Sequence, residues 1–370
     1  MSRSFTFGIV GGYGASGRAA VSEIWKFCNG EILVGGRDLA KGEALAAGFD
    51  GRVSAAQLDV FDTHSLDDFC GRCSIIVNCG GPVSQLQDRV AQAAFRQRCH
   101  YVDIAGLSFV KERMLFRGQE IADLGLSFVV SAGWIPGISE CLPVYSYAQA
   151  RAKMDSIESL TVYFGDSGEW SVNAFRDIAW YLRTARLLSP GYFHKGERVR
   201  AKLSGASRRV DLGSRIGLCR FSMFSTPELD EIGHRLKDCD VFTYSYVPGF
   251  RAALGPMLVA LLPLGEGLSV RLLQNGLRHV PLAVGGFVVV KILGRSQGRG
   301  LALTAQIVYD KHRDYWINGL VVATVARLIS ESKGVQAGVH FLADAVDPVA
   351  LMAELRKAGV EQTEQFDPCE

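Results

Sequence analysis

The sequence predicts an α/β fold: a doubly wound parallel Rossmann sheet with a second α+β domain built on a mostly antiparallel open sheet. Over the first 131 residues, six hydrophobic strand candidates alternate with helical segments, a rhythm that makes a parallel sheet. From about residue 157 the pattern becomes β-rich, with a hairpin-like connection over 294–300. Because 370 residues exceed one typical domain, we expect a Rossmann domain over 1–134 plus 316–370 and a second domain over 135–315.

The elements follow from hydrophobic runs and their turn residues. In the first domain we expect strands over 5–10, 31–37, 53–58, 74–79, 100–104 and 127–131, with helices over 18–27, 65–70, 86–96 and 110–124. In the second we expect strands over 159–164, 219–224, 241–246, 286–293 and 301–309, with helices over 172–187 and 249–262. The tail predicts helices over 317–330 and 347–358, the latter with Asp347 as N-cap.

The first strand runs directly into a glycine-rich turn of the form G-x-G-x-x-G. In such a turn the first glycine allows the tight bend, the second lets backbone approach a pyrophosphate, and the third lets the helix pack against the strand. Free N–H groups at the helix start, together with the helix dipole, favour bound phosphate. The sequence therefore predicts a dinucleotide site on Gly12, Tyr13, Gly14, Ala15, Ser16 and Gly17.

The end of the second strand indicates which dinucleotide is bound. A protein that prefers NAD places Asp or Glu there, to accept a hydrogen bond from the ribose 2′-hydroxyl. This chain has two glycines and then Arg37, with Lys41 one helical turn further on. Guanidinium binds a 2′-phosphate through paired, charge-assisted hydrogen bonds. We therefore expect NADP(H) as the preferred cofactor and NAD(H) as a second one, because Asp38 can pair with Arg37 or contact a ribose itself.

The carboxyl ends of the later strands offer further site residues, since ligands of such sheets bind there. Asp59 is expected near the adenine. The fourth strand ends in residues expected to line the pyrophosphate and the nicotinamide ribose, or alternatively to form only a Gly-Pro turn: Asn78, Gly80, Gly81 and Pro82.

The fifth strand places Tyr101 and Asp103 on one face, with the carboxylate at the carboxyl end. These are the candidate catalytic residues, because a carboxylate there can orient a substrate amine or relay a proton. Capping the next helix, or closing a hydrogen bond under the loop, is the alternative for Asp103. After the sixth strand, Trp134 and Pro136 mark the exit from the sheet, where they wall the substrate pocket or serve only packing.

Composition excludes several classes of protein. With 48% hydrophobic and 21% charged residues and a formal net charge of +2, the chain is expected to be globular and to bind no nucleic acid. The uninterrupted apolar core over 257–262 is too short to span a membrane. Nine cysteines without a secretory signal predict reduced thiols in a cytoplasm, and the pair over 70–73 is more typical of structure than of redox chemistry. Neither cysteines nor histidines show metal-ligand spacing.

The stretch over 183–220 carries ten Lys or Arg residues against Glu197 and Asp211. Such an excess can receive an acidic substrate or an acidic carrier protein, or it can be a solvated face. The β-rich second domain favours a homodimer formed through a free sheet face or edge.

Several runs in this order resemble the saccharopine dehydrogenase family: IVGGYGASG, LVGGR, IVNCGGP, HYVDIAG, GWIPGI and the closing GVHF and DPVALMAELRKAGV. The resemblance covers roughly the first 140 and the last 40 residues. It implies that the glycine turn holds the pyrophosphate, Arg37 the 2′-phosphate, and Asn78 with Gly80 the nicotinamide side. It also implies that Asp103 is the acidic residue beside the active site. Relatives usually have Asp before the Pro-Gly, where this chain has Ile135.

The resemblance implies an NADPH-dependent oxidoreductase that reduces an imine C=N of an amino-acid-derived substrate, or oxidises the matching secondary amine. One alternative is a trans-acting enoyl reductase on a carrier-bound or lipid-like acyl substrate, and another is a non-catalytic NADP(H)-binding sensor or scaffold. The partner is accordingly expected to be a small-molecule or carrier-bound substrate.

Overall fold

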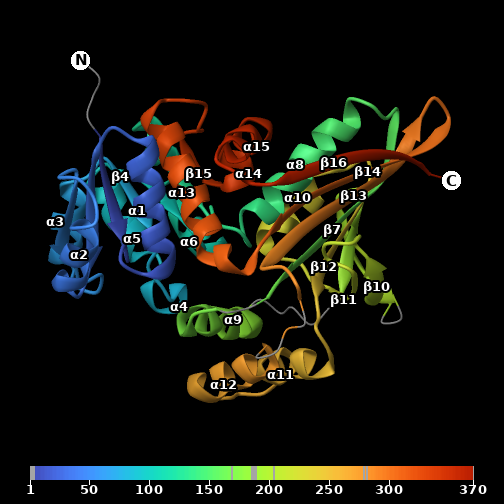
Figure 1. Ribbon diagram of the computed structural model, residues 1–370, viewed down its shortest axis with the longest axis horizontal. Helices are drawn as coiled ribbons and strands as arrows, with labels where there is room; N and C mark the ends of the chain where they lie inside the picture. Colours follow the sequence, from blue (N-terminus) through green and yellow to red (C-terminus); the bar gives the residue numbers. More distant parts are fainter. Residues whose placement is uncertain are drawn as a thin grey trace. The chain divides into compact units, whose positions relative to one another are not determined.

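The computed structural model describes residues 5–167, 170–184, 190–202, 205–277, 280 and 282–369. The chain divides into two compact units (Figure 1): Met1–Ile138 with Tyr315–Ala358, called unit 1, and Ser139–Asp314 with Gly359–Glu370, called unit 2. The sequence analysis places the end of the chain in the Rossmann domain, but residues 359–369 group with unit 2, where Gln362–Cys369 pair as a strand with residues 300–307.

Unit 1 is built on a seven-stranded parallel sheet of order β15-β6-β5-β4-β1-β2-β3. Its strands are short and mostly buried, as expected for a parallel sheet covered on both faces. They are β1 (Thr6–Val10), β2 (Glu31–Gly36), β3 (Val53–Gln57), β4 (Ile75–Asn78), β5 (His100–Asp103), β6 (Ser127–Val130) and β15 (Gly338–Phe341). The predicted doubly wound parallel sheet is confirmed, with β15 as a seventh strand contributed by the tail.

The helices of unit 1 connect and cover these strands. They are α1 (Ala15–Phe27), α2 (Leu39–Ala46), α3 (Thr63–Gly71), α4 (Val83–Leu86), α5 (Arg89–Arg96), α6 (Leu107–Leu115), α7 (Gly118–Asp123), α13 (Asp314–Ser330), α14 (Leu342–Ala345) and α15 (Pro348–Lys357). Two helices expected to be continuous are each divided in two. Gln87, with a φ of 54°, separates α4 from α5, and the chain between α6 and α7 breaks at Phe116 and Arg117.

Helix α13, near the end of the chain, packs against α1, and Figure 1 shows the two helices side by side. A Cβ at Gly319 would lie 2.4 Å from the Cβ of Ala19, so the two helices approach where only glycine fits. Trp316 donates its indole N–H to the buried carboxylate of Glu23 at 3.0 Å. The predicted cap is confirmed as well, since Asp347 accepts the backbone N–H of Val349 at 3.1 Å.

Unit 2 contains a nine-stranded, mostly antiparallel sheet with the path β10-β11-β12-β7-β13-β14-β16, to which β8 and β9 attach through β12. Among the strand pairs described in this sheet, β12–β7 is parallel and the others are antiparallel. The strands are β7 (Ser156–Asp166), β8 (Gly191–His194), β9 (Glu197–Arg200), β10 (Ser207–Asp211), β11 (Leu218–Met223), β12 (Asp240–Tyr246), β13 (Gly286–Ser296), β14 (Arg299–Tyr309) and β16 (Gln362–Cys369). The predicted mostly antiparallel second sheet is therefore confirmed.

The helices of unit 2 are α8 (Ile138–Arg151), α9 (Val172–Thr184), α10 (Pro227–Arg235), α11 (Phe250–Leu261) and α12 (Glu266–Leu277), with a 3-10 turn over Lys311–Arg313. An aromatic cluster around Tyr163, Phe221, Tyr244 and Phe287 forms the core on one face of the sheet. A second cluster, which includes Phe175 of α9, Val259 of α11 and Leu273 of α12, joins three helices. The end of the helix expected over 172–187 lies outside the described residues. Within the described chain, no helix combines the length and the apolar character needed to cross a bilayer.

Candidate functional site

The carboxyl edge of the unit 1 sheet begins with the glycine turn after β1. The N–H groups of Gly11 and Gly12 both donate to the carbonyl of Gly35, at 2.9 and 3.3 Å, so the turn is held against the end of β2. Gly11 has a φ of +70°, the left-handed region that favours glycine. The N–H groups of Ala15, Ser16 and Gly17 open α1, and such first-turn groups have no acceptor within their own helix.

The second and third glycines of the motif have different requirements. A Cβ at Gly17 would lie 2.2 Å from the carbonyl oxygen of Gly11, so the turn and the helix pack too closely for any side chain. A Cβ at Gly14 would meet only that same oxygen, at 3.1 Å, and the φ of Gly14 is an ordinary −69°. A side chain at position 14 therefore requires only a small shift of the Gly11 carbonyl, whereas a pyrophosphate lying against the helix N-terminus would meet the added carbon directly.

Tyr13 joins this turn to the end of β2. Its hydroxyl accepts the backbone N–H of Asp38 at 3.0 Å, and a Cβ at Gly36 would lie 2.3 Å from its ring. Arg18 donates to the carbonyl of Tyr13 at 2.8 Å. The two consecutive glycines at the end of β2 thus make room for the Tyr13 ring and for the turn.

Asp38 pairs with Lys41, not with Arg37. Its carboxylate caps α2 by accepting the Lys41 backbone N–H at 3.2 Å, and it forms an ion pair with the Lys41 ammonium, also at 3.2 Å. These hydrogen bonds to Lys41 lower the pKa of Asp38. Arg37 is exposed, and within the described residues its guanidinium has no ion-pair partner. The guanidinium that the sequence predicts to hold a ribose 2′-phosphate therefore has no acidic partner in the described part of the chain.

In the sheet, β3 lies next to β2, and β4 lies next to β1 on the other side. Gln57 donates from its side chain to the Arg37 carbonyl at 3.5 Å, and the exposed Asp59 begins a turn by accepting the Phe61 N–H at 3.0 Å. Asn78 is 8% exposed; it accepts the Gly80 N–H at 3.0 Å and donates to the Tyr101 hydroxyl at 3.2 Å.

The turn after β4 also touches the glycine turn after β1. A Cβ at Gly11 would lie 3.0 Å from the Cα of Gly80. The loop then passes through Gly81 to Pro82, which is the N-cap residue of α4. The structure thus brings together the predicted cofactor residues that follow β1 and β4.

Asp103 lies buried beneath the loop that follows β5. Its Oδ1 accepts the backbone N–H groups of Gly106 at 2.5 Å and Ser131 at 2.9 Å, so one carboxylate ties the loop after β5 to the loop after β6. Burial raises the pKa of this carboxyl to about 6, although the Ser131 and Gly106 N–H groups and the Tyr101 hydroxyl act to lower it. A Cβ at Gly106 would lie 2.3 Å from its Oδ2. This geometry matches the alternative that Asp103 closes hydrogen bonds under the loop.

Tyr101, the other candidate catalytic residue, is also buried. Its ring lies 5.5 Å from that of Phe128, and its hydroxyl accepts from Asn78. Burial, followed by the neighbouring Asp103, raises the pKa of the phenol well above its usual value. Tyr101 and Asp103 are therefore both buried beneath the loops at the carboxyl ends of the strands, and both form hydrogen bonds there.

Two non-glycine residues in the left-handed region stand on the loops that Asp103 joins. They are Leu107, with a φ of 58°, and Ser131, with a φ of 62°, and the Ser131 hydroxyl accepts the Leu107 N–H at 3.0 Å. Such backbone conformations cost roughly 1–3 kcal/mol and persist where neighbouring structure enforces them. The sequence analysis missed both residues, because neither is a residue type that signals this conformation.

Trp134 and Pro136 belong to a tight loop after β6. Gly133 donates to the Pro136 carbonyl at 3.1 Å, and the backbone N–H of Trp134 donates to the side chain of Asn318, on α13, at 2.8 Å. Trp134 is 3% exposed. The tail helix therefore fixes this loop within unit 1, a role for Asn318 that no local sequence signal indicates.

In the cysteine pair that precedes β4, Cys70 is buried and Cys73 is half-buried. Cys99 directs its thiol to the carbonyls of Cys70 and Cys73, both at 3.2 Å. Burial raises the pKa of the Cys73 thiol to about 12 and raises that of Cys70 as well, which disfavours a reactive thiolate. The described residues contain no group of three or more His, Cys, Asp or Glu able to hold a metal ion.

Comparison with known proteins identifies a similar domain and a similar fold. Residues 7–129 match the family model of the saccharopine dehydrogenase NADP binding domain. The apo, histidine-tagged saccharopine dehydrogenase (L-Glu forming) from Saccharomyces cerevisiae has a similar structure, with a TM-score of 0.71, 14% sequence identity, and 98% of this chain and 100% of that chain covered. That likeness shows the fold.

Two further solved structures are more distant. An oxidoreductase from Agrobacterium radiobacter in complex with NAD+, L-tartaric acid and magnesium has a TM-score of 0.49 and 8% identity, with 97% of this chain and 98% of that chain covered. GenD2 from gentamicin A biosynthesis, in complex with NAD, has a TM-score of 0.46 and 11% identity, with 98% and 96% covered. No curated protein matches the sequence.

Proposed function

We propose that the chain is a saccharopine dehydrogenase-like oxidoreductase, which uses NADPH to reduce an imine C=N of an amino-acid-derived substrate or oxidises the matching secondary amine. One observation supports the cofactor preference above all others. The guanidinium of Arg37 has no ion-pair partner among the described residues, while the acid beside it, Asp38, pairs with Lys41. The imine is proposed from the family, in which hydride transfer takes place at a carbon–nitrogen bond.

In this proposal, different residues at the carboxyl ends of the strands bind different parts of the cofactor. The N–H groups at the start of α1 hold the pyrophosphate, and Arg37 holds the 2′-phosphate. Asn78 and Gly80 line the nicotinamide side. When bound, the cofactor supplies the hydride, while the protein supplies position and electrostatics.

We propose that Asp103 acts chiefly as a positioning residue. Its carboxylate holds the loops that begin at Gly106 and Ser131, and these loops border the place where the substrate would lie. Contact of Asp103 or Tyr101 with the substrate, and of Trp134 or Pro136 with its pocket, stays a prediction.

A second candidate reaction is the reduction of a carbon–carbon double bond on a carrier-bound or lipid-like acyl substrate. The exposed apolar side chains of unit 2 favour it: Met257 and Leu261 on α11, Leu262 after it and Leu268 on α12 are 43–59% exposed. Exposed apolar side chains of this kind suit an apolar partner or substrate.

A substrate panel separates the two reactions. Purified protein is mixed with NADPH and with cyclic imines, with keto acids plus amino acids, or with enoyl thioesters, and NADPH consumption is followed by absorbance. Turnover of the first two groups supports imine reduction, whereas turnover of the enoyl thioesters alone would replace it with the second candidate. Failure of both NADPH and NADH to bind at millimolar concentration would overturn both reactions.

We also propose a homodimer formed through unit 2. The edge strands β10 and β16 each present a row of backbone groups that the sheet leaves unpaired on one side. Light scattering on the purified chain tests this, and a mass near 40.2 kDa would contradict it.

A further inference from the structure

The basic stretch over 183–220 separates into arginines with partners and arginines without them. Four of them bind within unit 2: Arg183 to the Leu264 carbonyl and Ser269, Arg198 to Asp230, Arg208 to Tyr163 and Tyr244, and Arg215 to Asp310 and Glu361. Arg186 lies outside the described residues. The charges that remain uncompensated therefore identify where this stretch can receive a ligand.

Arg209 and Arg220 place two positive charges next to each other, and this arrangement does not stabilise the sheet. They stand directly opposite each other on the antiparallel strands β10 and β11. Like charges in this arrangement repel and lower stability. Both are exposed, and neither has an ion-pair partner in the part of the chain that the structure describes. The acid two positions along β10, Asp211, accepts the Gly213 N–H at 3.0 Å instead.

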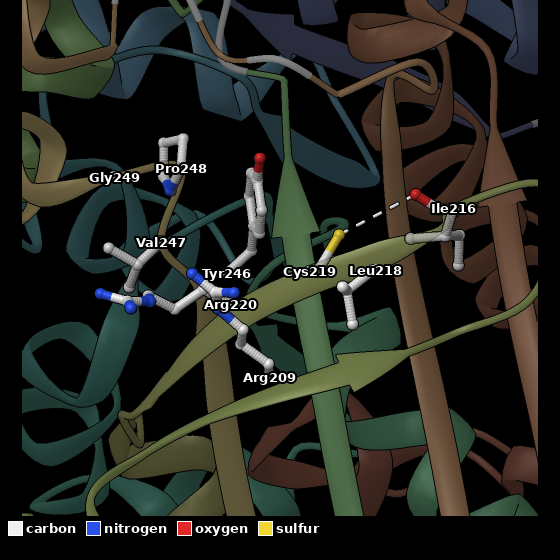
Figure 2. A pocket seen from close by; sticks show the side chains of 9 residues that line it. All are labelled: Arg209, Ile216, Leu218, Cys219, Arg220, Tyr246, Val247, Pro248 and Gly249. Atoms are coloured by element: carbon white, nitrogen blue, oxygen red, sulfur yellow. Dashed lines mark hydrogen bonds between the residues drawn. The ribbon is translucent and has the colours of Figure 1, made fainter.

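The pair borders a cavity of about 510 Å³. The cavity lies beside the end of the β11–β12 pairing, where Phe221 pairs with Tyr246 and the Val247 N–H donates to the Arg220 carbonyl at 2.9 Å. Figure 2 shows both guanidinium groups on the side of the cavity where Val247 lies.

Beside the two guanidinium groups, Cys219 and Gly249, the lining includes apolar side chains. Ile216, Leu218, Tyr246, Val247 and Pro248 contribute to it, and Leu218 is 67% exposed although it is aliphatic. The site therefore combines two adjacent positive charges with an aliphatic and aromatic wall. A free inorganic anion would satisfy only the first of these two features.

We propose that this cavity binds a phosphate monoester that carries an apolar chain. Two guanidinium groups balance the charge of about −1.5 to −2 on such a phosphate, and their N–H donors match its oxygens. A carboxylate ligand carries a single negative charge and would neutralise only one of the two guanidinium groups. The apolar chain lies against Val247, Pro248 and Leu218. This site belongs to unit 2 alone and does not depend on the proposed hydride transfer.

Isothermal titration with octyl phosphate, at a concentration below its micelle limit and with NADPH saturating, tests the proposal on the full chain. We expect octyl phosphate to bind more tightly than octanoate, which has the same chain length with a single charge, and more tightly than inorganic phosphate. Arg209→Gln and Arg220→Gln should each weaken binding by about tenfold or more, as for the loss of a charge-assisted hydrogen bond. Arg299→Gln, on the β13–β14 hairpin, is the matched control and should bind as wild type does.

Two natural sources share this ligand chemistry, and a second pair of measurements distinguishes them. One is lysophosphatidic acid in solution, at a concentration below its micelle limit, and the other is the headgroup of phosphatidic acid, tested by sedimentation with phosphatidylcholine vesicles that contain or lack it. Binding to either that is lost in the Arg209→Gln/Arg220→Gln double variant supports the site and identifies its source. Equal binding of octyl phosphate to wild type and double variant, or no binding to wild type, would overturn the proposal. A thermal melt of each variant, with NADPH affinity as a second readout, shows whether unit 1 and unit 2 remain folded.

Discussion

The hydroxyl of Tyr13 accepts the backbone N–H of Asp38 at 3.0 Å, and this bond fixes the glycine turn to the end of β2. It has two consequences for charge. The Asp38 backbone is held so that its carboxylate caps α2 and pairs with Lys41, and the preceding side chain, Arg37, stays exposed. The acid that follows Arg37 in the sequence is thus paired with Lys41, and the Arg37 guanidinium has no ion-pair partner among the described residues.

The glycines of the turn can be tested separately. Gly17→Ala places a Cβ 2.2 Å from the Gly11 carbonyl oxygen and should lower the free energy of unfolding by about 1–3 kcal/mol, because the packed turn must shift. Gly14→Ala meets only one atom at 3.1 Å and should keep the wild-type melting temperature within a few degrees. Its NADPH affinity should nevertheless fall by about tenfold or more, because the methyl group occupies the pyrophosphate's approach. Unchanged NADPH binding in a folded Gly14→Ala variant would remove the pyrophosphate from this turn.

Asp103 makes stability depend on pH in a predictable direction. Its folded-state pKa of about 6 lies above the ordinary 3.8, so between about pH 4 and 6 the folded protein holds a proton that the unfolded chain has lost. Stability due to this group is therefore greatest below about pH 4 and is lost as the pH rises through 6, by about 3 kcal/mol in total.

Asp103→Asn removes this titration and keeps an oxygen that can accept from Gly106 and Ser131. Relative to wild type, the variant should gain stability as the pH rises from 4 to 6, measured by urea denaturation with Trp fluorescence. A difference in unfolding free energy that stays constant over this range would show that the carboxyl is not buried in the way described.

The contact between the tail and α1 can be tested with a pair of glycine substitutions. Gly319→Ala places a Cβ 2.4 Å from Ala19 and should lower the free energy of unfolding by about 1–3 kcal/mol. Gly118→Ala, at the start of α7, meets nothing closer than 3.8 Å and should be neutral or stabilise by up to about 1 kcal/mol. Equal melting temperatures for the two variants would contradict the close approach of α13 and α1.

The sequence predicts those parts of the structure that depend on residues close together in the chain. The glycine turn, the strands up to Val130 and the Asp347 cap are local patterns, and the structure confirms them. By contrast, β10 and β16 are rich in polar and charged residues, because they lie at the edges of a sheet, where hydrophobic alternation is weak. The four residues of β15 are too few to distinguish a strand from part of the tail by pattern alone.

The candidate site shows the same division. The residues after β1, β2 and β4 were predicted from their place at strand ends. Asn318 reaches the loop after β6 from 184 positions away in the sequence, and the partners of Asp103 lie on two separate loops. Such contacts depend on tertiary packing, so no local pattern reports them.

The central proposal is that Arg37 makes the protein prefer NADPH over NADH. Fluorescence titration of wild type and Arg37→Gln with NADPH and NADH tests it most directly. Wild type should bind NADPH more tightly than NADH. Arg37→Gln should lose about tenfold to a hundredfold in NADPH affinity while NADH binding stays within about twofold. Lys41→Gln is the matched control and should lose less, because the Lys41 ammonium already pairs with Asp38. Equal losses for the two cofactors in Arg37→Gln, or tighter binding of NADH by wild type, would contradict the account.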